Sequence, residues 1–269
     1  MLLKRTLAAL VLAAIGIPAL ILGGFFYFVL IMLLLGIASW EYGKVFQTAG
    51  NHASIPLLVG GVLLVTTMRA YFPDLASTTL TLLILSSMTW HLVDYENGRD
   101  LAATDFAVTI AGIVYLGWIG AYLIDVRNLP DGLWWLLLIL PATWLSDSAA
   151  YFVGRRFGKH RLSPRLSPKK TWEGYWGGVV IGTLGTAGLA ILWKSMGGPA
   201  ISWLQGALLG GILSIMVTLG DLGESMFKRQ AGVKDSSNIM PGHGGILDRL
   251  DSWLWAGALG YFLLVWIFL

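Results

Sequence analysis

Stretches of mostly apolar residues dominate this chain of 269 residues and constrain its fold more than any other feature. A helix that crosses a bilayer needs about 20 such residues, and nine stretches of roughly that length can be placed. They cover residues 7–23, 24–41, 54–71, 75–92, 101–125, 131–153, 173–194, 201–220 and 252–269. The first two adjoin at Gly23 and Gly24, so eight is the alternative count. The sequence therefore predicts an all-α polytopic membrane protein with about nine transmembrane helices.

The composition supports this class. Hydrophobic residues make up 56% of the chain and charged residues 12%, whereas soluble domains are about 25% charged. Cysteine is absent, which excludes disulfides and thiolate-bound metals, so any metal must have oxygen or imidazole ligands. The first apolar stretch follows Lys4 and Arg5, and because further spans follow at once, we interpret it as a retained helix and not a cleaved signal peptide. Membrane lipids are the expected surroundings, and no nucleic-acid partner is expected.

The distribution of positive charge predicts the orientation. Between Arg155 and Lys170 there are seven Lys or Arg residues and no acid, which indicates a cytoplasmic loop by the positive-inside rule. With nine spans, the N-terminus, the loop 154–172 and the loop 221–251 all fall on the cytoplasmic side. A patch for anionic lipids is the alternative reading of the basic loop.

The chemistry-bearing residues lie in the second half of the chain. We expect residues 1–130 to form a transmembrane scaffold and residues 131–269 a catalytic half that carries the two cytoplasmic loops. Four acids lie in or at the ends of apolar stretches of this half: Asp147, Glu173, Asp221 and Glu224. A carboxylate at the bilayer centre costs about 2.5–3.5 kcal/mol, so such residues usually face a polar cavity. Packing against neighbouring hydroxyls is the alternative for Asp147.

Two groups of acids have helical spacing. In the first group, one helix face carries Asp221, Glu224, Ser225 and Lys228 at positions i, i+3, i+4 and i+7. Asp248 and Asp251 are three residues apart at the start of the last span, where an interaction with the helix dipole is the alternative role. Mg²⁺ is usually held by one or two carboxylates, with substrate phosphates and water completing its shell. We therefore predict Asp221 and Asp248 as a metal pair, with Asp251 as a further candidate.

A third group of residues suits phosphate. The segment "PGHGG" surrounds His243 with Gly242, Gly244 and Gly245, and such a turn allows backbone N–H groups to converge on an anion. His243 itself has three open roles, namely phosphate contact, general base or structural hydrogen bonding. The nearby cations are Lys228, Arg229 and Lys234. Lys169 and Lys170 directly precede a helix start, which favours phosphate as well.

The run "SMFKRQAGVKDSSNIMPGHGGILDRLDS" at residues 225–252 closely resembles the signature of the phosphatidate cytidylyltransferases, also called CDP-diacylglycerol synthases. The stretch "DSAAYFVGRRFGKHRLSPRLSPKKTWEG" is also similar to that family, and the specific resemblance covers about residues 141–252. One position departs from the family pattern: Ser237 stands where a glycine is usual. If the turn requires a positive φ, the serine would be strained there.

The resemblance implies transfer of CMP from CTP to phosphatidic acid, with Mg²⁺, giving CDP-diacylglycerol and pyrophosphate. A second metal or a monovalent ion is left open, as is a homodimer. Asp221 and Asp248 would hold the metal, and Ser225 and Asp147 would line or order the site. Phosphates would meet Lys228, Arg229, Lys234 and the "PGHGG" backbone, and Lys169 and Lys170 would meet the CTP triphosphate or the lipid headgroup. The nucleophile is already an anionic phosphate oxygen, which favours phosphate contact over proton transfer for His243.

Two other functions are weighed against this one. A transporter of a phosphorylated metabolite would also need acids and cations within the membrane, but it should show broken helices in both halves. A CTP-dependent lipid kinase would share the metal and phosphate requirements, but it would release CDP instead of pyrophosphate. If the source is bacterial, the expected location is the inner membrane.

Overall fold

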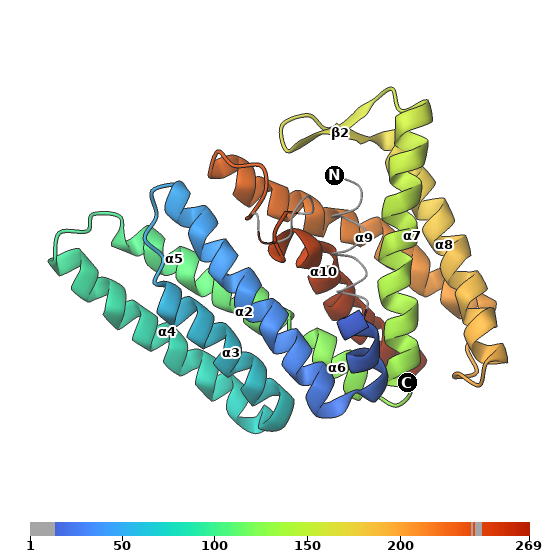
Figure 1. The fold of residues 1–269 in the computed structure, drawn as a ribbon, viewed down its shortest axis with the longest axis horizontal. Helices are drawn as coiled ribbons and strands as arrows, with labels where there is room; N and C mark the ends of the chain where they lie inside the picture. The colour runs from blue at the N-terminus through green and yellow to red at the C-terminus, as the bar shows by residue number, and fades with distance from the viewer. Residues whose placement is uncertain (1–13, 238, 240–243) are drawn as a thin grey trace. The chain divides into compact units, whose positions relative to one another are not determined.

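The computed structural model describes residues 14–237, 239 and 244–269, and nearly all of them are helical (Figure 1). Within these residues, seven helical segments are long and apolar enough to cross a membrane, and an eighth is apolar but shorter. The elements are α2 (Gly24–Thr48), α3 (Ile55–Tyr71), α4 (Pro73–Glu96), α5 (Ala102–Gly112), the π-helical η1 (Ile113–Ile119), α6 (Tyr122–Asn128), α7 (Gly132–Phe157), β1 (Arg161–Ser163), β2 (Ser167–Thr171), α8 (Trp172–Ser195), α9 (Trp203–Gln230), α10 (Leu247–Leu263) and η2 (Leu264–Phe268). The predicted all-α polytopic membrane fold is confirmed.

Each expected stretch from residue 24 onward corresponds to a helix or to a run of adjoining helices. The first expected stretch lies mostly in residues 1–13, outside the described residues, although residues 14–22 are helical. Gly23 and Gly24 separate that helix from α2, with φ angles of 64° and 48°, a left-handed backbone that glycine adopts without steric cost. The first two stretches are therefore separate helices. The total of nine and the cytoplasmic N-terminus stay predictions.

The chain forms two compact units. Unit 1 comprises Met1–Ile124 and Phe227–Leu250, and unit 2 comprises Asp125–Met226 and Asp251–Leu269. The charged loop after α9 thus belongs to the same compact unit as the first half of the chain. The predicted division into a scaffold half and a catalytic half concerns function and stays a prediction.

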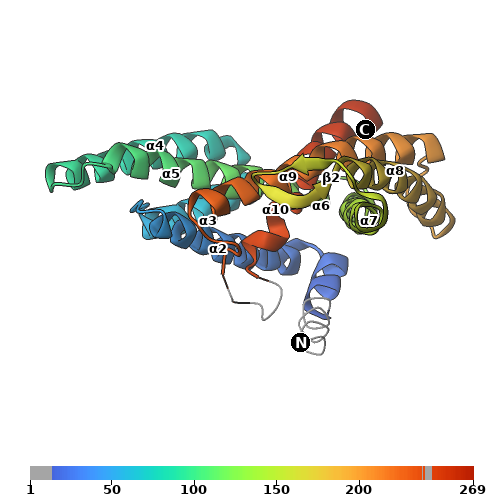
Figure 2. The same ribbon diagram turned by 90° about the horizontal axis from the view of Figure 1, so that it is seen from above.

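Unit 1 is built around α3, which packs against α2, α4 and η1, while α4 also packs against α5 (Figures 1 and 2). Leu35, Leu58 and Ile113 are completely buried in its core. The turn between α4 and α5 is held by Arg99, whose Nε lies 2.7 Å from Oδ2 of the buried Asp105. The Asp105 hydrogen bond and charge raise the pKa of the Arg99 guanidinium, so Arg99 stays protonated at physiological pH.

Unit 2 is dominated by the close packing of α7 on α8 (Figure 2). A Cβ added to Gly174 would lie 2.6 Å from the Ala150 carbonyl oxygen and 3.0 Å from Gly154 Cα. Small residues therefore let the two helices approach closely, as expected within a membrane. Gly178 makes a similar close approach, because an added Cβ would lie 2.7 Å from the Ser146 carbonyl oxygen.

A small antiparallel hairpin, β1 and β2, connects α7 to α8 (Figure 1). The sequence indicated only a basic loop here. Thr171 caps α8 by accepting a hydrogen bond from the Gly174 N–H at 3.2 Å. Glu173, in the first turn of α8, accepts hydrogen bonds from the N–H groups of Lys159 and His160. These contacts fix the base of the hairpin to the helix that follows it.

Candidate functional site

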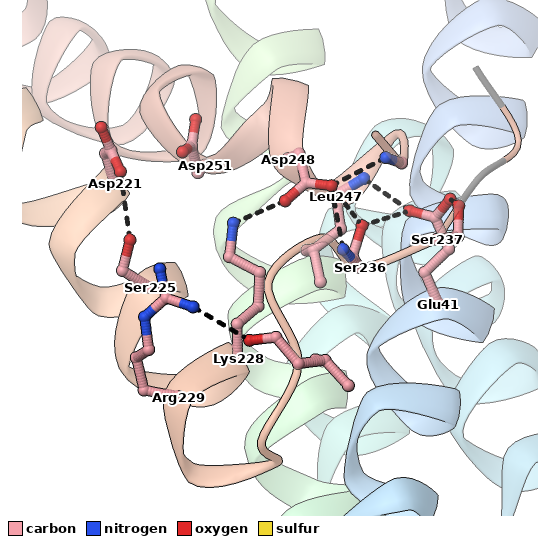
Figure 3. A network of polar contacts seen from close by, with 12 residues as sticks. Glu41, Asp221, Ser225, Lys228, Arg229, Ser236, Ser237, Leu247, Asp248 and Asp251 are labelled. Atoms are coloured by element: carbon pink, nitrogen blue, oxygen red, sulfur yellow. Dashed lines mark hydrogen bonds and ion pairs between the residues drawn. The ribbon is translucent and has the colours of Figure 1, made fainter. Parts of the chain in front are cut away.

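Asp248 is the centre of a buried polar network at the start of α10, in unit 1 (Figure 3). Its Oδ1 lies 2.5 Å from Lys228 Nζ, and the two side chains are only 8% and 12% exposed. Its Oδ2 accepts the N–H of Ser236 at 3.0 Å, the hydroxyl of Ser236 at 2.8 Å and the N–H of Gly245 at 2.7 Å. Asp248 therefore joins the end of α9, the loop after it and α10.

The structure adds a residue that the sequence analysis missed, the completely buried Glu41 of α2. Its carboxylate accepts the hydroxyl of Ser237 at 2.5 Å and the N–H groups of Ile246 and Leu247 at 3.1 and 2.7 Å (Figure 3). The hydroxyl of Ser236 lies 3.3 Å from the same carboxylate. An available signal was the rule that an ionisable residue within an apolar span marks a polar site. Glu41 was missed because the predicted span ended at residue 41, which placed Glu41 at the end of the helix. Helix α2 in fact continues to Thr48, so Glu41 lies within it.

The loop shows how Ser237 fits where the family usually has glycine. Among the described residues, Asp131 is the only one other than glycine with a positive φ. Ser237 is therefore not strained in the way that a requirement for positive φ would imply, and its hydroxyl bonds to Glu41. Among the described loop residues, Gly232 and Gly244 have positive φ angles, 70° and 81°. Gly242 and His243 lie outside the described residues, so the predictions made for them stay predictions.

The predicted phosphate ligands near the end of α9 differ in their surroundings. Lys228 is mostly buried against Asp248. Arg229 is exposed and donates through Nη1 to the Val233 carbonyl oxygen at 3.1 Å. Lys234 is exposed on the loop. The structure thus brings Lys228 to the predicted metal ligand Asp248, and it leaves Arg229 exposed in the last turn of α9 and Lys234 exposed on the loop that follows.

A second polar group lies in unit 2 around Asp221 of α9. Its Oδ2 forms an ion pair with Nζ of Lys170, at the end of β2. Its Oδ1 lies 3.4 Å from the hydroxyl of Ser225, one turn further along α9 (Figure 3). The predicted proximity of Asp221 and Ser225 is observed. Lys169, the other predicted phosphate ligand of this segment, is exposed.

Two more carboxylates interact electrostatically with Asp221 within unit 2. Asp147 of α7 interacts with Asp221 and with Lys170, and Asp251 of α10 interacts with both Asp221 and Asp147. Asp251 is 8% exposed, and its Oδ1 accepts the N–H of Ser252 at 2.5 Å. Three carboxylates from three helices thus lie within electrostatic range of one another, and Lys170 provides a single positive charge among them.

These carboxylates are suitable ligands for a hard divalent cation. Mutual repulsion between like charges is relieved when a cation binds between them, and carboxylate oxygen is the preferred protein ligand of Mg²⁺. Within the described residues, no group of three or more His, Asp or Glu side chains has the geometry to hold one metal ion. Mg²⁺ is, however, commonly held by one or two carboxylates.

The comparisons with known proteins agree with one another. The model of the cytidylyltransferase family matches residues 3–267. A protein of Bacillus subtilis named phosphatidate cytidylyltransferase is 40% identical over 196 residues, which are 72% of this chain and 66% of that relative. A protein of the same name from Pseudomonas aeruginosa is 34% identical over 259 residues, 94% of this chain and 93% of the relative. One from Staphylococcus saprophyticus is 34% identical over 265 residues, 98% of this chain and 99% of the relative.

Proposed function

Since the chain belongs to the cytidylyltransferase family, we propose that it transfers CMP from CTP to phosphatidate in phospholipid biosynthesis. The products are CDP-diacylglycerol and pyrophosphate. The observation that carries this proposal is the length of the match, which runs over nearly the whole chain both for the family model and for relatives named phosphatidate cytidylyltransferase. The membrane-spanning fold suits a lipid substrate of this kind.

The reaction joins two anions. A phosphate oxygen of phosphatidate attacks the α-phosphorus of CTP, a new P–O bond forms, and the bond to the β-phosphate breaks to release pyrophosphate. Cations must lower the repulsion between the reactants and stabilise the charge that develops on the leaving group. We assign this role to Lys228, Arg229 and Lys234 near the end of α9, and to Lys169 and Lys170 at the end of the hairpin.

No general base is needed, because the attacking oxygen is already ionised at neutral pH. His243 is therefore proposed as a phosphate contact in the "PGHGG" segment, together with Gly242, Gly244 and Gly245. Of these glycines, Gly245 donates its N–H to Asp248 Oδ2, which places it beside the predicted metal ligand.

The residues present fit a divalent cation, for which Mg²⁺ is the proposed identity. The support is the accumulation of negative charge around Asp221, which Asp147 and Asp251 repel and with which Lys170 forms an ion pair. We propose Asp221 and Asp251, both in unit 2, as ligands, and the pairing of Asp221 with Asp248 stays a prediction from the sequence. When bound, the ion would supply Lewis-acid stabilisation of phosphate oxygens. Asp248 has a second role that the structure shows directly, because it binds Lys228 and the loop.

The proposed orientation places the charged loops on the cytoplasmic side. The basic segment between Arg155 and Lys170 supports it through the positive-inside rule. Residues Arg155, Arg156 and Lys159, at and just beyond the end of α7, are exposed, as that rule requires. In a bacterium this corresponds to the inner membrane. A homodimer stays an open prediction, tested by the mass of the detergent-solubilised protein.

The function is tested by measuring pyrophosphate release from CTP by the purified full-length protein in detergent micelles. Phosphatidate is present or omitted, and Mg²⁺ is supplied or removed with EDTA. We expect release only with both phosphatidate and Mg²⁺, and none from Asp221→Asn. Asp74→Asn is the matched control, since Asp74 is an exposed acid at the start of α4.

Each alternative outcome identifies another function. Release of CDP with formation of a phosphorylated lipid would indicate a lipid kinase. A well-folded protein that releases neither product would contradict enzymatic activity and favour the transporter. Full activity in EDTA would reject the metal while leaving the transfer reaction intact.

A further inference from the structure

We propose that Glu41 is a positioning residue for the proposed cytidylyl transfer, because it fixes the start of α10 and the loop residues Ser236 and Ser237 beside Asp248. This inference rests on the proposed function for its effect on catalysis, but the positioning itself is a property of unit 1. All the residues that carry it, on α2, the end of α9, the loop and the first turn of α10, belong to that unit.

The first argument is the position of the Glu41 carboxylate at the N-terminus of α10. The first N–H groups of a helix have no partner within the helix and need an external acceptor. Glu41 accepts the N–H groups of Ile246 and Leu247, at 3.1 and 2.7 Å. A carboxylate also interacts favourably with the positive end of the helix dipole. Glu41 therefore caps α10 from a helix that is 206 residues away from Leu247 in the chain.

The second argument is that Glu41 and Asp248 hold the same loop segment. The hydroxyl of Ser236 lies 2.8 Å from Asp248 Oδ2 and 3.3 Å from Glu41 Oε2. A Cβ on Gly245 would lie 2.5 Å from Glu41 Oε2, so only glycine allows the backbone this close to the carboxylate. Through Ser236 and Gly245, a displacement of Glu41 would be transmitted to Asp248, and from Asp248 to Lys228.

The third argument is that α2 also holds the other end of the loop. Phe227, which directly precedes Lys228, packs edge-on against Tyr42 with ring centroids 5.6 Å apart. It lies at the same distance from Phe46, one turn further along α2. Helix α2 thus contacts the end of α9 through its aromatic rings and the start of α10 through Glu41.

Ser237 strengthens this arrangement in a way that a glycine could not. Its hydroxyl donates to Glu41 Oε1 at 2.5 Å, and hydrogen bonds to an ionised acceptor are about twice as strong as neutral ones. The serine at this position therefore adds a tether between the loop and α2. Substitution of Ser237 should weaken the positioning without removing the cap on α10.

The proposal is tested with Glu41→Gln, Ser237→Ala and Asp105→Asn in the full-length protein in detergent. In either orientation, the glutamine places an NH₂ donor against one of the two backbone N–H groups at the start of α10. Asp105→Asn is the matched control, because Asp105 is an equally buried acid of unit 1 that contacts Arg99 and not the loop. Two quantities are measured: hydrogen exchange of peptides containing Ile246 and Leu247, and the kcat and KM for CTP.

For Glu41→Gln we expect exchange at Ile246 and Leu247 to accelerate about tenfold and the KM for CTP to rise about tenfold, the effect of losing one charge-assisted hydrogen bond. Ser237→Ala leaves the cap on α10 in place, so it should raise the exchange rate and the KM for CTP by only about threefold. Asp105→Asn should lower thermal stability but leave exchange at these two residues and the KM for CTP unchanged.

The proposal would be overturned if Glu41→Gln left hydrogen exchange at Ile246 and Leu247 and the KM for CTP unchanged. Equal changes in Asp105→Asn would also overturn it, because they would indicate general destabilisation. If Glu41→Gln does not fold, Ser237→Ala decides, and unchanged exchange and KM in that variant overturn the proposal. A wild-type protein that releases no pyrophosphate would refute the proposed function instead, and the exchange measurements would still decide whether Glu41 holds the start of α10.

Discussion

The ion pair between Lys228 and Asp248 yields a quantitative prediction about stability. The two side chains are 12% and 8% exposed and their charged atoms lie 2.5 Å apart. Loss of one partner of a buried pair leaves an uncompensated charge and costs about 3–5 kcal/mol. We therefore expect Lys228→Met to lower the free energy of unfolding by about 3 kcal/mol or more.

The double variant should be less harmful than the sum of the single ones. In Asp248→Asn the new amide NH₂ faces either the Lys228 ammonium or the donors of Ser236 and Gly245. In both arrangements a hydrogen-bond donor points at another donor, which is unfavourable. When Lys228 is also replaced by methionine, the NH₂ can occupy the Oδ1 position, and the remaining oxygen keeps its three hydrogen bonds from Ser236 and Gly245. We expect a coupling energy of about 2 kcal/mol, within the range for residues in contact.

The assay is SDS-induced unfolding in mixed micelles, followed by tryptophan fluorescence. Lys44→Met is the matched control, since Lys44 is an exposed lysine of unit 1 and its replacement should not shift the midpoint. Additive losses in the double variant would refute the reasoning, because they would show that the two charges do not depend on each other in the folded protein.

Three further predictions concern packing and buried charge. Gly245→Ala should reduce pyrophosphate release at least tenfold, because its Cβ would lie 2.6 Å from the Glu41 carboxyl carbon. Gly60→Ala is the control and should be neutral, because no atom lies within 4 Å of its added Cβ. Equal activities of the two variants would contradict the predicted clash. Arg99→Leu should lower stability in the same unfolding assay, because it leaves the buried Asp105 without its cation. Its KM for CTP should stay at the wild-type value. Gly174→Ala should lower the midpoint temperature of thermal unfolding of unit 2, since its Cβ would lie 2.6 Å from a carbonyl oxygen of α7. An unchanged midpoint would show that α7 and α8 can move apart without loss of stability.

The sequence predicted the fold class because hydrophobic stretches of sufficient length have few alternatives to a membrane helix. It also identified Asp248, Lys228 and the Asp221–Ser225 pair, because acids and cations are rare and informative in such a chain. It did not predict the β1–β2 hairpin. Three- and five-residue strands with exposed Arg and Lys residues have no clear alternation of polar and apolar side chains.

Glu41 was missed for a different reason. Its partners Ser236, Ser237, Ile246 and Leu247 lie 195 to 206 residues further along the chain. Helical spacing relates residues only three or four positions apart, so no local pattern connects Glu41 to the loop. Its position inside an apolar helix was the only available signal, and that signal indicates a polar site without identifying the partner.

The contacts of Glu41 explain why the signature stretch contains glycines where it does. Gly244 adopts a φ of 81°, which directs the chain back toward α10. Gly245 then passes so close to the Glu41 carboxylate that a methyl group has no space. Glycine at position 244 is therefore required by its φ and by Asp248 Oδ2, which would lie 2.5 Å from an added Cβ, whereas glycine at position 245 is required by Ser236 and by the Glu41 carboxylate from the first half of the chain. It follows that a shorter residue at position 41 would leave the first N–H groups of α10 without their acceptor. Glycine would still be required at position 245, because an added Cβ would clash with Ser236 Oγ.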